Sequence, residues 1–572
     1  MSGEIVETPD EMFRRVANSL ARIETLYNPQ ADVVSIAQDF YQAMLQLEFL
    51  PNTPTLMNAG TGIGQLSACF VIPVPDSTEG IFDAVKYMAM IHRSGGGTGF
   101  SFSNLRPKGD IVRLTKGVAS GPVSFMKIFD VTTEVIKQGG KRRGANMGIL
   151  RADHPDIMEF IDVKKDSVAL TNFNISVALT DQFMKAVLLD TEYDLIHPRT
   201  STVVKRLNAN EVFNRIVDSA WETGDPGLIF IDEINRLNPT PGVGPIEATN
   251  PCGEQPLLPW ESCNLGSINL VRFVSGNDLD WGRLRAIVRM SVRMLDNVID
   301  ANMYPISMIE EVTKKNRKIG LGVMGFAEML IKLGIPYDSE EGMSWGERVM
   351  RFIHDEGIRM SNELGESRGS FPNFGFSIWK DRLKAMRNST VTTIAPTGTI
   401  SIIAGTSSGI EPLFAVSYVR HILDGSRLLE VNSLFEEMAR KRGFYSIELM
   451  RKIASQGSVQ HIDDVPDDIK RIFVTALDID PEWHVKMQAT FQKYTDNAVS
   501  KTVNLPSSAT RDDVRRIFLL AYRLKCKGIT VYRYGSRSQQ VLIITPLDTE
   551  ESKHVEVEPE YSGGCPTGVC SF

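Results

Sequence analysis

Cysteine is scarce in this chain of 572 residues, which contains only six. A cysteine content of about 1% excludes a fold held together by disulfides and is typical of a protein in a reducing compartment, so we expect a cytoplasmic protein. No two cysteines form a CxxC motif, and no histidine stands at zinc-finger spacing from them. The sequence therefore does not predict a structural zinc site.

Long apolar runs and an excess of positive charge are missing as well. No apolar stretch reaches the roughly 18 residues of a membrane helix, and the acidic N-terminal sequence lacks the apolar core of a signal peptide. The 62 lysines and arginines are outnumbered by 70 aspartates and glutamates, which gives a net charge of −8. We expect neither a membrane protein nor one that coats nucleic acid, although a local basic site for a small phosphate ligand is compatible with this balance.

The hydrophobic pattern divides the chain into three regions. Residues 1–48 have the periodicity of amphipathic helices and predict a helical N-terminal segment. Over residues 49–535, short apolar runs such as NISVAL and GLIFID alternate with amphipathic stretches, which is typical of an α/β domain with parallel strands. Residues 536–572 are polar and contain acidic residues, proline and glycine, so we expect a flexible tail there.

Two cysteines, Cys565 and Cys570, stand at the end of this predicted tail. A solvated tether is a poor place for buried apolar thiols, so we interpret the pair as a mobile dithiol that visits another site. A terminal metal clip is the alternative. Cys526 lies in a stretch with helical periodicity, and we interpret it as a small buried apolar side chain.

Three glycine-containing segments are similar to nucleotide-binding motifs. Residues 320–325 match GxGxxG, but the charged, helical sequence before them is not the apolar strand that a dinucleotide fingerprint requires. Residues 138–144, QGGKRRG, combine three cations with glycines and suit a polyphosphate, with a solvated surface loop as the alternative. Residues 395–401, APTGTIS, offer N–H and hydroxyl groups to a phosphate, with a tight turn as the alternative.

The most informative segment, residues 250–267, reads NPCGEQPLLPWESCNLGS. Three prolines and a glycine exclude a continuous helix in its first part, which must be a loop. In an extended loop alternate residues face the same way, so Asn250, Cys252 and Glu254 would point at one bound molecule. The segment has no histidine to activate a nucleophilic thiol. A thiol between an amide and a carboxylate, with Cys263 as a redox partner, favours redox or radical chemistry.

This segment resembles the finger loop of ribonucleotide reductases, most closely that of the adenosylcobalamin-dependent (class II) enzymes. Six further segments in the same order resemble the same family and extend the resemblance over about residues 50–535. They are NTPTLMNAG (52–60), LSACF (66–70), RSGGGTGFSFSNLRPKG (93–109), QGGKRRGAN (138–146), RKIGLGVMGFAE (317–328) and APTGTIS (395–401). Seven ordered segments are far more specific than a single motif.

The resemblance implies a fold and a reaction. The fold would be a ten-stranded α/β barrel of two antiparallel five-stranded parallel halves, with the finger loop threaded through its centre. The GxGxxG match would then reflect barrel packing. The reaction would convert ribonucleotides to 2′-deoxyribonucleotides by a thiyl-radical mechanism, with the radical generated from adenosylcobalamin. The sequence is compatible with diphosphate and with triphosphate substrates.

The resemblance also implies catalytic roles. Cys252 matches the position of the thiyl radical that removes the 3′ hydrogen of the ribose. Glu254 matches the base that takes the 3′-OH proton, and Asn250 matches the amide that holds the substrate hydroxyls. Cys69 and Cys263 match the dithiol that supplies two electrons and ends as a disulfide.

Further positions match substrate contacts and the source of electrons. The tail dithiol, Cys565 and Cys570, would reduce the buried disulfide with electrons from a thioredoxin-like protein. The residues at substrate-contacting positions are Thr53, Ala68, Cys69, Gly97, Asn250, Pro251, Cys252, Gly253, Glu254, Pro396, Thr397, Gly398, Thr399 and Ile400.

An effector site is implied at a dimer interface. Asp76 matches an acidic residue that holds the effector nucleotide, and Arg106, Lys141 and Arg142 lie where the family binds a deoxynucleoside triphosphate. The resemblance thus implies a homodimer in which the effector sets which base is reduced. The helical N-terminal segment is too short for a complete ATP-binding activity domain, so on/off control by ATP and dATP is not expected.

The source of the radical distinguishes the remaining alternatives. A class I catalytic subunit with a separate radical-generating subunit is disfavoured by three features of the sequence. The motif is NPCGEQ and not NLCxE, and the spacing between Cys252 and Cys263 is short. Tyr532 and Tyr534 are not adjacent, so they do not form the tyrosine pair that would relay a radical from a partner subunit. A terminal CPTGVCSF in place of a glycyl-radical loop disfavours the anaerobic class. A non-catalytic nucleotide-binding homologue is opposed by the five redox cysteines, and an NAD-dependent dehydrogenase rests on the glycine motif alone.

Overall fold

The computed structural model describes residues 6–111, 117–137, 144–166, 168–421, 427–536, 542–544 and 555–557. Lys141 and Arg142 of the expected effector loop lie outside the described residues, as do Cys565 and Cys570 of the tail. Among the described helices, none is long and apolar enough to cross a membrane.

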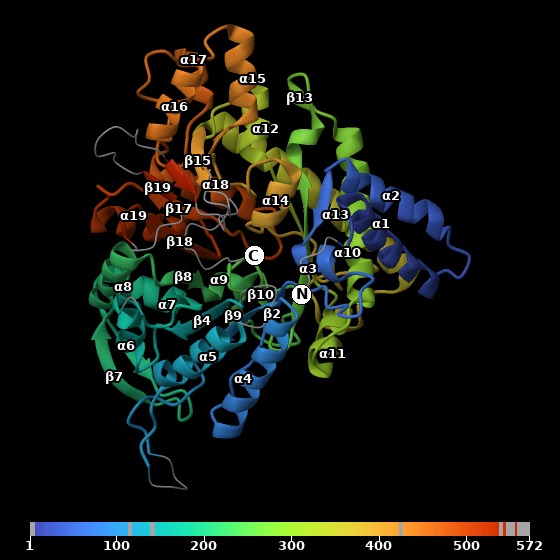
Figure 1. The fold of residues 1–572 in the computed structure, drawn as a ribbon. Helices are drawn as coiled ribbons and strands as arrows, with labels where there is room; N and C mark the ends of the chain where they lie inside the picture. The colour runs from blue at the N-terminus through green and yellow to red at the C-terminus, as the bar shows by residue number, and fades with distance from the viewer. Residues whose placement is uncertain are drawn as a thin grey trace.

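The N-terminal segment is a pair of helices that packs on one side of the barrel (Figure 1). α1 (Pro9–Ala21) begins at a capping box, in which the side chains of Thr8 and Glu11 each accept the other's backbone N–H. α2 (Val33–Leu45) follows after the 3-10 turn η1 (Arg22–Leu26). The buried apolar faces of both helices join α10 in one core, so this segment is part of the globular body.

A ten-stranded main sheet forms the centre of the molecule. Its strands are β1 (Phe49–Pro51), β2 (Cys69–Val71), β3 (Gly97–Ser101), β4 (Asn146–Arg151), β5 (Phe173–Leu179), β8 (Gly227–Phe230), β11 (Ser262–Asn269), β14 (Ile319–Met324), β17 (Thr502–Leu505) and β18 (Gly528–Arg533). One half is the run β2-β3-β4-β5-β8, in which every neighbouring pair is parallel.

The second half closes the sheet into a barrel. In it β11 is parallel to β14, and β17 is parallel to β18. The parallel bridges Leu321–Thr392 and Ile394–Val499 connect these pairs through residues 392–394. The halves meet antiparallel at both seams, β2 with β11 and β8 with β18, and β1 is added on β11. The expected barrel of two antiparallel halves of parallel strands is confirmed.

Helices cover the outside of the barrel (Figure 1). Around the first half lie α4 (Thr78–Arg93), α5 (Pro122–Lys137), α6 (Ile157–Asp162), α7 (Asp181–Leu189), α8 (Ala209–Thr223) and α9 (Ile231–Arg236). The remaining helices are α3 (Thr53–Asn58), α10 (Trp281–Ala301), α11 (Ser307–Asn316), α12 (Phe326–Leu333), α13 (Glu340–Arg368), α14 (Gly398–Ala404), α15 (Ser433–Arg442), α16 (Ile447–Gln456), α17 (Asp467–Ile472), α18 (Pro481–Gln492) and α19 (Arg511–Arg523).

Smaller strands lie outside the main sheet. β6 (Glu192–Ile196) and β7 (Val203–Asn208) form a hairpin, as do β12 (Val274–Ser275) and β13 (Asp278–Leu279). A separate sheet contains β15 (Ser417–His421), β16 (Arg427–Val431), β19 (Leu542–Ile544) and β20 (Val555–Val557).

Strand alternation separates the outer core from the lining of the barrel. On β5, Ile175 and Val177 pack in the core beneath the helices, whereas Ala178 belongs to the inner cluster. That inner cluster also contains Cys69 and Cys263, so the barrel interior brings together cysteines that are far apart in the sequence.

Two features of the sequence are explained by packing. Gly320 and Gly322 lie within β14, where a side chain at Gly322 would collide with the carbonyl of Thr393, so the GxGxxG match is confirmed as barrel packing. Cys526 is buried as expected. Its expected helical position is wrong, because α19 ends at Arg523 and Lys525 adopts a left-handed φ of 61°.

A buried ionic network ties α10 to the second half of the barrel. The carboxylate of Asp296, which is fully buried, lies 2.7 Å from Arg317, 2.8 Å from Arg368 and 3.2 Å from Arg387. Burial alone would raise the pKa of Asp296, but the three arginines lower it to about 2. Arg368 also reaches Glu24 of the N-terminal segment at 2.6 Å, so the network spans both parts of the chain.

Replacing Arg317 is expected to destabilise the protein. Arg317→Met leaves Asp296 buried with fewer partners, and breaking such a buried pair costs about 3–5 kcal/mol. Arg206→Met is the matched control, because the Arg206–Asp194 pair is exposed and such pairs contribute up to about 1 kcal/mol. Urea denaturation should give a clearly lower midpoint for Arg317→Met than for Arg206→Met, and equal midpoints would contradict the role assigned to the network.

Candidate active site

The finger loop is a short hairpin with a turn at its tip. β9 (Ala248–Thr249) pairs antiparallel with β10 (Pro256–Leu257). Gly253 donates its N–H to the Asn250 carbonyl at 3.1 Å and has a φ of 78°, which glycine adopts readily. The expectation of an extended tip is therefore wrong, because the chain reverses between Asn250 and Glu254.

The barrel holds this hairpin between its halves. On the side of the first half, β3 passes so close that a side chain at Gly99 would collide with the Thr249 carbonyl. On the other side, the Glu254 carbonyl accepts hydrogen bonds from Ala498 N–H at 2.9 Å and from the Thr393 hydroxyl at 3.1 Å. The tip is thus fixed in the middle of the barrel.

Asn250 and Glu254 converge on Cys69. The Asn250 amide donates to Cys69 Sγ at 3.1 Å, and the Cys69 thiol donates a long hydrogen bond of 4.0 Å to Glu254 Oε1. All three side chains are buried. The structure therefore brings the amide and the carboxylate of the finger loop to a thiol of β2, Cys69, whereas the alternation of the sequence predicted the thiol of Cys252 between them.

Cys263 lies directly opposite Cys69 in the antiparallel pair of β11 and β2. Residues opposite each other in such a pair share a face and have Cα atoms about 4.5–5.5 Å apart, within the range that a disulfide spans. The four cysteines that the structure describes are all in the thiol form. Burial raises the pKa of the Cys263 thiol well above its ordinary value, so this thiol is protonated at neutral pH.

Cys252 opens onto a different space. It is half-buried and, with Pro251 and Gly253, lines a narrow cleft that is partly open to solvent. Asn250 and Glu254 are not among the residues of this cleft. The polar residues in its wall are Asn174, Ser176, Asp225, Gln488, Ser500, Lys501, Thr502 and Thr530. Cys252 therefore lines this cleft, whereas its neighbours in the loop, Asn250 and Glu254, contact Cys69.

Other expected substrate residues flank the finger loop. Gly97 donates its N–H to the Ala68 carbonyl at 2.9 Å, and a side chain at Gly97 would touch the Pro251 ring. Thr53 begins α3 at the end of β1. Pro396 lines the cleft of Cys252. Thr397 is the N-cap of α14, whose first turn contains Gly398, Thr399 and Ile400, and its hydroxyl accepts a hydrogen bond of 2.7 Å from Gly409 N–H.

The expected effector residues Asp76 and Arg106 form an ion pair. Arg106 Nε lies 3.0 Å from both carboxylate oxygens of Asp76, and Asp76 raises the pKa of the Arg106 guanidinium. Arg199 approaches Asp76 at 3.8 Å and Asp110 at 3.7 Å. The sequence gave no signal for Arg199, because it lies in the β6–β7 turn, far from the matching segments.

A lysine in the wall of the cleft was also missed. Lys501 Nζ lies 2.6 Å from Glu411 and 3.0 Å from His484 Nδ1, and its side chain is fully buried. Burial lowers the pKa of Lys501, although Glu411 opposes this effect. No motif surrounds Lys501 in the sequence.

Comparisons with known proteins agree with this geometry. A family model described as the barrel domain of ribonucleotide reductase matches residues 67–532, and one described as its all-alpha domain matches residues 1–64. A relative from Thermoplasma acidophilum, named vitamin B12-dependent ribonucleoside-diphosphate reductase, is 53% identical over 99% of this chain and 83% of its own length. A relative of the same name from Mycobacterium tuberculosis is 48% identical over 100% of this chain and 80% of its own length.

A solved structure shares the fold. The class Id ribonucleotide reductase alpha subunit of Actinobacillus ureae superposes with a TM-score of 0.77 at 23% identity, over 94% of this chain and 95% of the other. At that identity the likeness concerns the fold alone. The family models match nearly the whole chain, and the two relatives are similar over almost all of it. The chain therefore belongs to the ribonucleotide reductase family.

Proposed function

We propose that this chain is a vitamin B12-dependent ribonucleoside-diphosphate reductase. The observation that carries the proposal is that the tip of the finger loop presents Cys252 to the cleft, while Asn250 and Glu254 on either side of it contact Cys69. The names of the relatives at 53% and 48% identity support the choice of cofactor and of diphosphate substrates.

In this proposal the radical chemistry starts at Cys252. Its thiyl radical takes the 3′ hydrogen of the substrate ribose and returns it at the end of the reaction. Glu254 accepts the proton of the 3′-OH, and the Asn250 amide holds the substrate hydroxyls. Both side chains lie against Cys69, which supports a ribose bound over that thiol. Residues 396–400, at the start of α14, would bind the phosphates.

Cys69 and Cys263 supply the two hydrogens that the reduction consumes. The 2′ C–O bond breaks and water leaves, a C–H bond forms at the 2′ carbon, and the two sulfurs join in one disulfide. The cross-strand register of the two cysteines supports this pairing. The protonated state of Cys263, which follows from its burial, suits a hydrogen donor.

The cleft at Cys252 fits the nucleoside part of adenosylcobalamin. Asn174, Ser176, Gln488 and Thr530 would bind it through amide and hydroxyl groups. Gln488 Oε1 is buried and accepts no hydrogen bond within the described part of the chain, so it is available to a ligand donor. When bound, the cofactor supplies the one-electron chemistry that converts a thiol to a radical. The chain places Cys252 in the cleft wall and limits the access of water.

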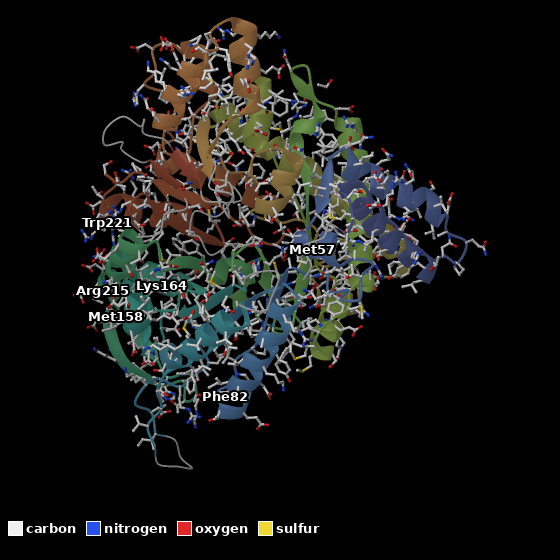
Figure 2. The ribbon with its side chains drawn as sticks, viewed as in Figure 1. Met57, Phe82, Met158, Lys164, Arg215 and Trp221 are labelled. Carbon is white, nitrogen blue, oxygen red and sulfur yellow. The ribbon has the colours of Figure 1, made fainter. Side chains whose placement is uncertain are left out.

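The effector site and the homodimer belong to the same proposal. Asp76, Arg106 and Arg199 would bind a deoxynucleoside triphosphate that sets which base is reduced. Apolar side chains stand exposed on the neighbouring helices: Phe82 of α4, at the outer end of that helix in Figure 2, and Val131 and Val135 of α5. Exposed apolar surface of this kind often marks a protein–protein contact, which supports a dimer interface there.

Loss of the Asp76 carboxylate should remove substrate selection and leave catalysis intact. Asp76→Ala is expected to weaken effector binding at least about tenfold, because a charge-assisted contact and the orientation of Arg106 are lost together. Asp83→Ala, in the helix α4 that follows Asp76, is the matched control, because the Asp83 carboxylate is exposed and forms its ion pair with Lys86. Substrate preference would be measured in competition among the four ribonucleotides with each effector, and an unchanged preference in Asp76→Ala would contradict the assignment.

The proposed activity is tested by turnover. The purified chain, a ribonucleoside diphosphate and a small dithiol should give 2′-deoxynucleotide only when adenosylcobalamin is added. Parallel reactions with triphosphates decide between the two substrate classes. Product formation without cobalamin would contradict the proposed cofactor.

A further inference from the structure

A fully buried ion pair lies at the base of the finger loop. Lys318 Nζ is 2.8 Å from Glu261 Oε2, and both side chains are 0% exposed. Removing two charges from water is costly, and replacing such a pair by apolar side chains often leaves a protein as stable or makes it more stable. No step of the proposed reaction uses either residue.

The pair holds the returning arm of the finger loop. Lys318 Nζ donates to the Pro256 carbonyl at 3.4 Å, and Leu258 N–H donates to Glu261 Oε2 at 2.7 Å. The other carboxylate oxygen accepts a hydrogen bond of 2.7 Å from the Asn316 amide. The arm that returns from Cys252 to β11 is thus fixed by these two side chains.

The same pair flanks one thiol of the dithiol. The Cys263 thiol donates to the Lys318 carbonyl at 3.5 Å, and Glu261 is two residues before Cys263. Burial raises the pKa of the Cys263 thiol, the Lys318 charge lowers it, and the charges of Glu261 and Glu254 raise it further. Cys69 on the facing strand is a further titratable neighbour, and Lys527 interacts electrostatically with Lys318. The charges of Lys318 and Glu261 therefore act on Cys263 in opposite directions, with Glu254 as a second negative neighbour.

We propose that Glu261 and Lys318 are positioning residues for the Cys69–Cys263 dithiol. The pair fixes the arm of the finger loop, and its two opposite charges leave unchanged the neutral state that burial gives the Cys263 thiol, which is then able to give up a hydrogen. The part of this inference that concerns hydrogen donation rests on the proposed function. The state of the thiol is measured without substrate or cofactor, so the two can fail separately.

Single substitutions should act on Cys263 in opposite directions. Glu261→Gln leaves the lysine charge uncompensated and should speed alkylation of Cys263 by iodoacetamide at pH 8 at least about tenfold, since the thiolate is the reacting form. Lys318→Met leaves the carboxylate uncompensated and should slow it by a similar factor. Rates would be read on the full chain by mass spectrometry of the Cys263 peptide. The dithiol–disulfide equilibrium should shift in opposite directions too, a tenfold change being about 30 mV.

Cys526 is the internal control, because its thiol is buried in an apolar core and its pKa is raised by burial and not by a charge of this pair. Its alkylation rate should be the same in all variants. A shift of Cys263 in the same direction in both single variants, no shift in either, or a parallel change at Cys526 would overturn the role of the charges, because simple loosening of the barrel predicts these results.

A double variant tests the positioning role even where a single variant does not fold. Glu261→Met/Lys318→Met removes both charges at similar volume, and such replacements are tolerated. Cys263 should then be alkylated at nearly the wild-type rate. Cys252, whose loop arm has lost its anchors, should be alkylated at least about threefold faster through increased local opening. An unchanged rate at Cys252 would overturn the positioning role.

Discussion

Cys252→Ser is expected to fold like the wild-type protein and to form no deoxynucleotide. The substitution is nearly isosteric, and Cys252 is half-buried at a turn, so little packing is lost. An O–H bond is much stronger than an S–H bond, so a serine cannot take over as the radical carrier. Turnover should therefore fall to the level of a blank without cobalamin, while circular dichroism and the thermal midpoint stay close to those of the wild type.

The control for this experiment is another cysteine. Cys526→Ala changes a thiol that is buried in an apolar core and belongs to no part of the proposed site. It should retain most of the turnover. Deoxynucleotide formation by Cys252→Ser above the blank would contradict the assignment of the radical to this residue.

Replacement of both tail cysteines should limit the enzyme to a single turnover. Cys69 and Cys263 are only 3% and 1% exposed, so a reductant protein has no direct access to a disulfide between them. Cys565 and Cys570 can carry electrons inwards, because thiol–disulfide exchange needs only brief contact and a fraction of thiolate. The expected flexible tail over residues 536–572 is wrong for residues 542–544 and 555–557, because β19 and β20 join β15 in a sheet. A tether counted from Val557 to Cys565 has eight residues, and a flexible chain of that length spans about 16 Å.

The choice of reductant separates the tail from the active site. Cys565→Ser/Cys570→Ser should form about one product per pre-reduced chain and then stop with thioredoxin as reductant, because the buried disulfide is not reduced. A small dithiol that diffuses into the barrel should restore repeated turnover. If the double variant turns over with thioredoxin at the wild-type rate, the tail is not the carrier.

Much of the fold and of the site could be predicted because the segments that build them are local and ordered along the chain. The strands and helices alternate with clear periodicity, and the barrel follows from the family that seven segments identify. Asn250, Cys252 and Glu254 stand close together in the sequence, so their common place in the finger loop could be predicted from the sequence. The expected divisions of the chain at residues 48 and 535 stay predictions.

The features of the site that could not be predicted depend on contacts between residues far apart in the sequence, and no sequence motif marks these residues. Arg199 reaches Asp76 across more than a hundred residues of sequence, and Lys318 meets Glu261 only because β11 and β14 are neighbours. The turn at the tip of the finger loop was missed because alternation was assumed where Gly253 reverses the chain. Such features require the closed barrel and not the local sequence.

The central claim, that the Cys252 sulfur carries the radical, is tested most directly by electron paramagnetic resonance. The chain would be labelled with cysteine deuterated at Cβ, mixed with adenosylcobalamin and effector, and frozen within milliseconds to seconds. The account predicts a paramagnetic signal that narrows with the label and is missing from Cys252→Ser. A signal whose line width is the same with and without the label would contradict the claim. A signal that is also present in Cys252→Ser would contradict it as well.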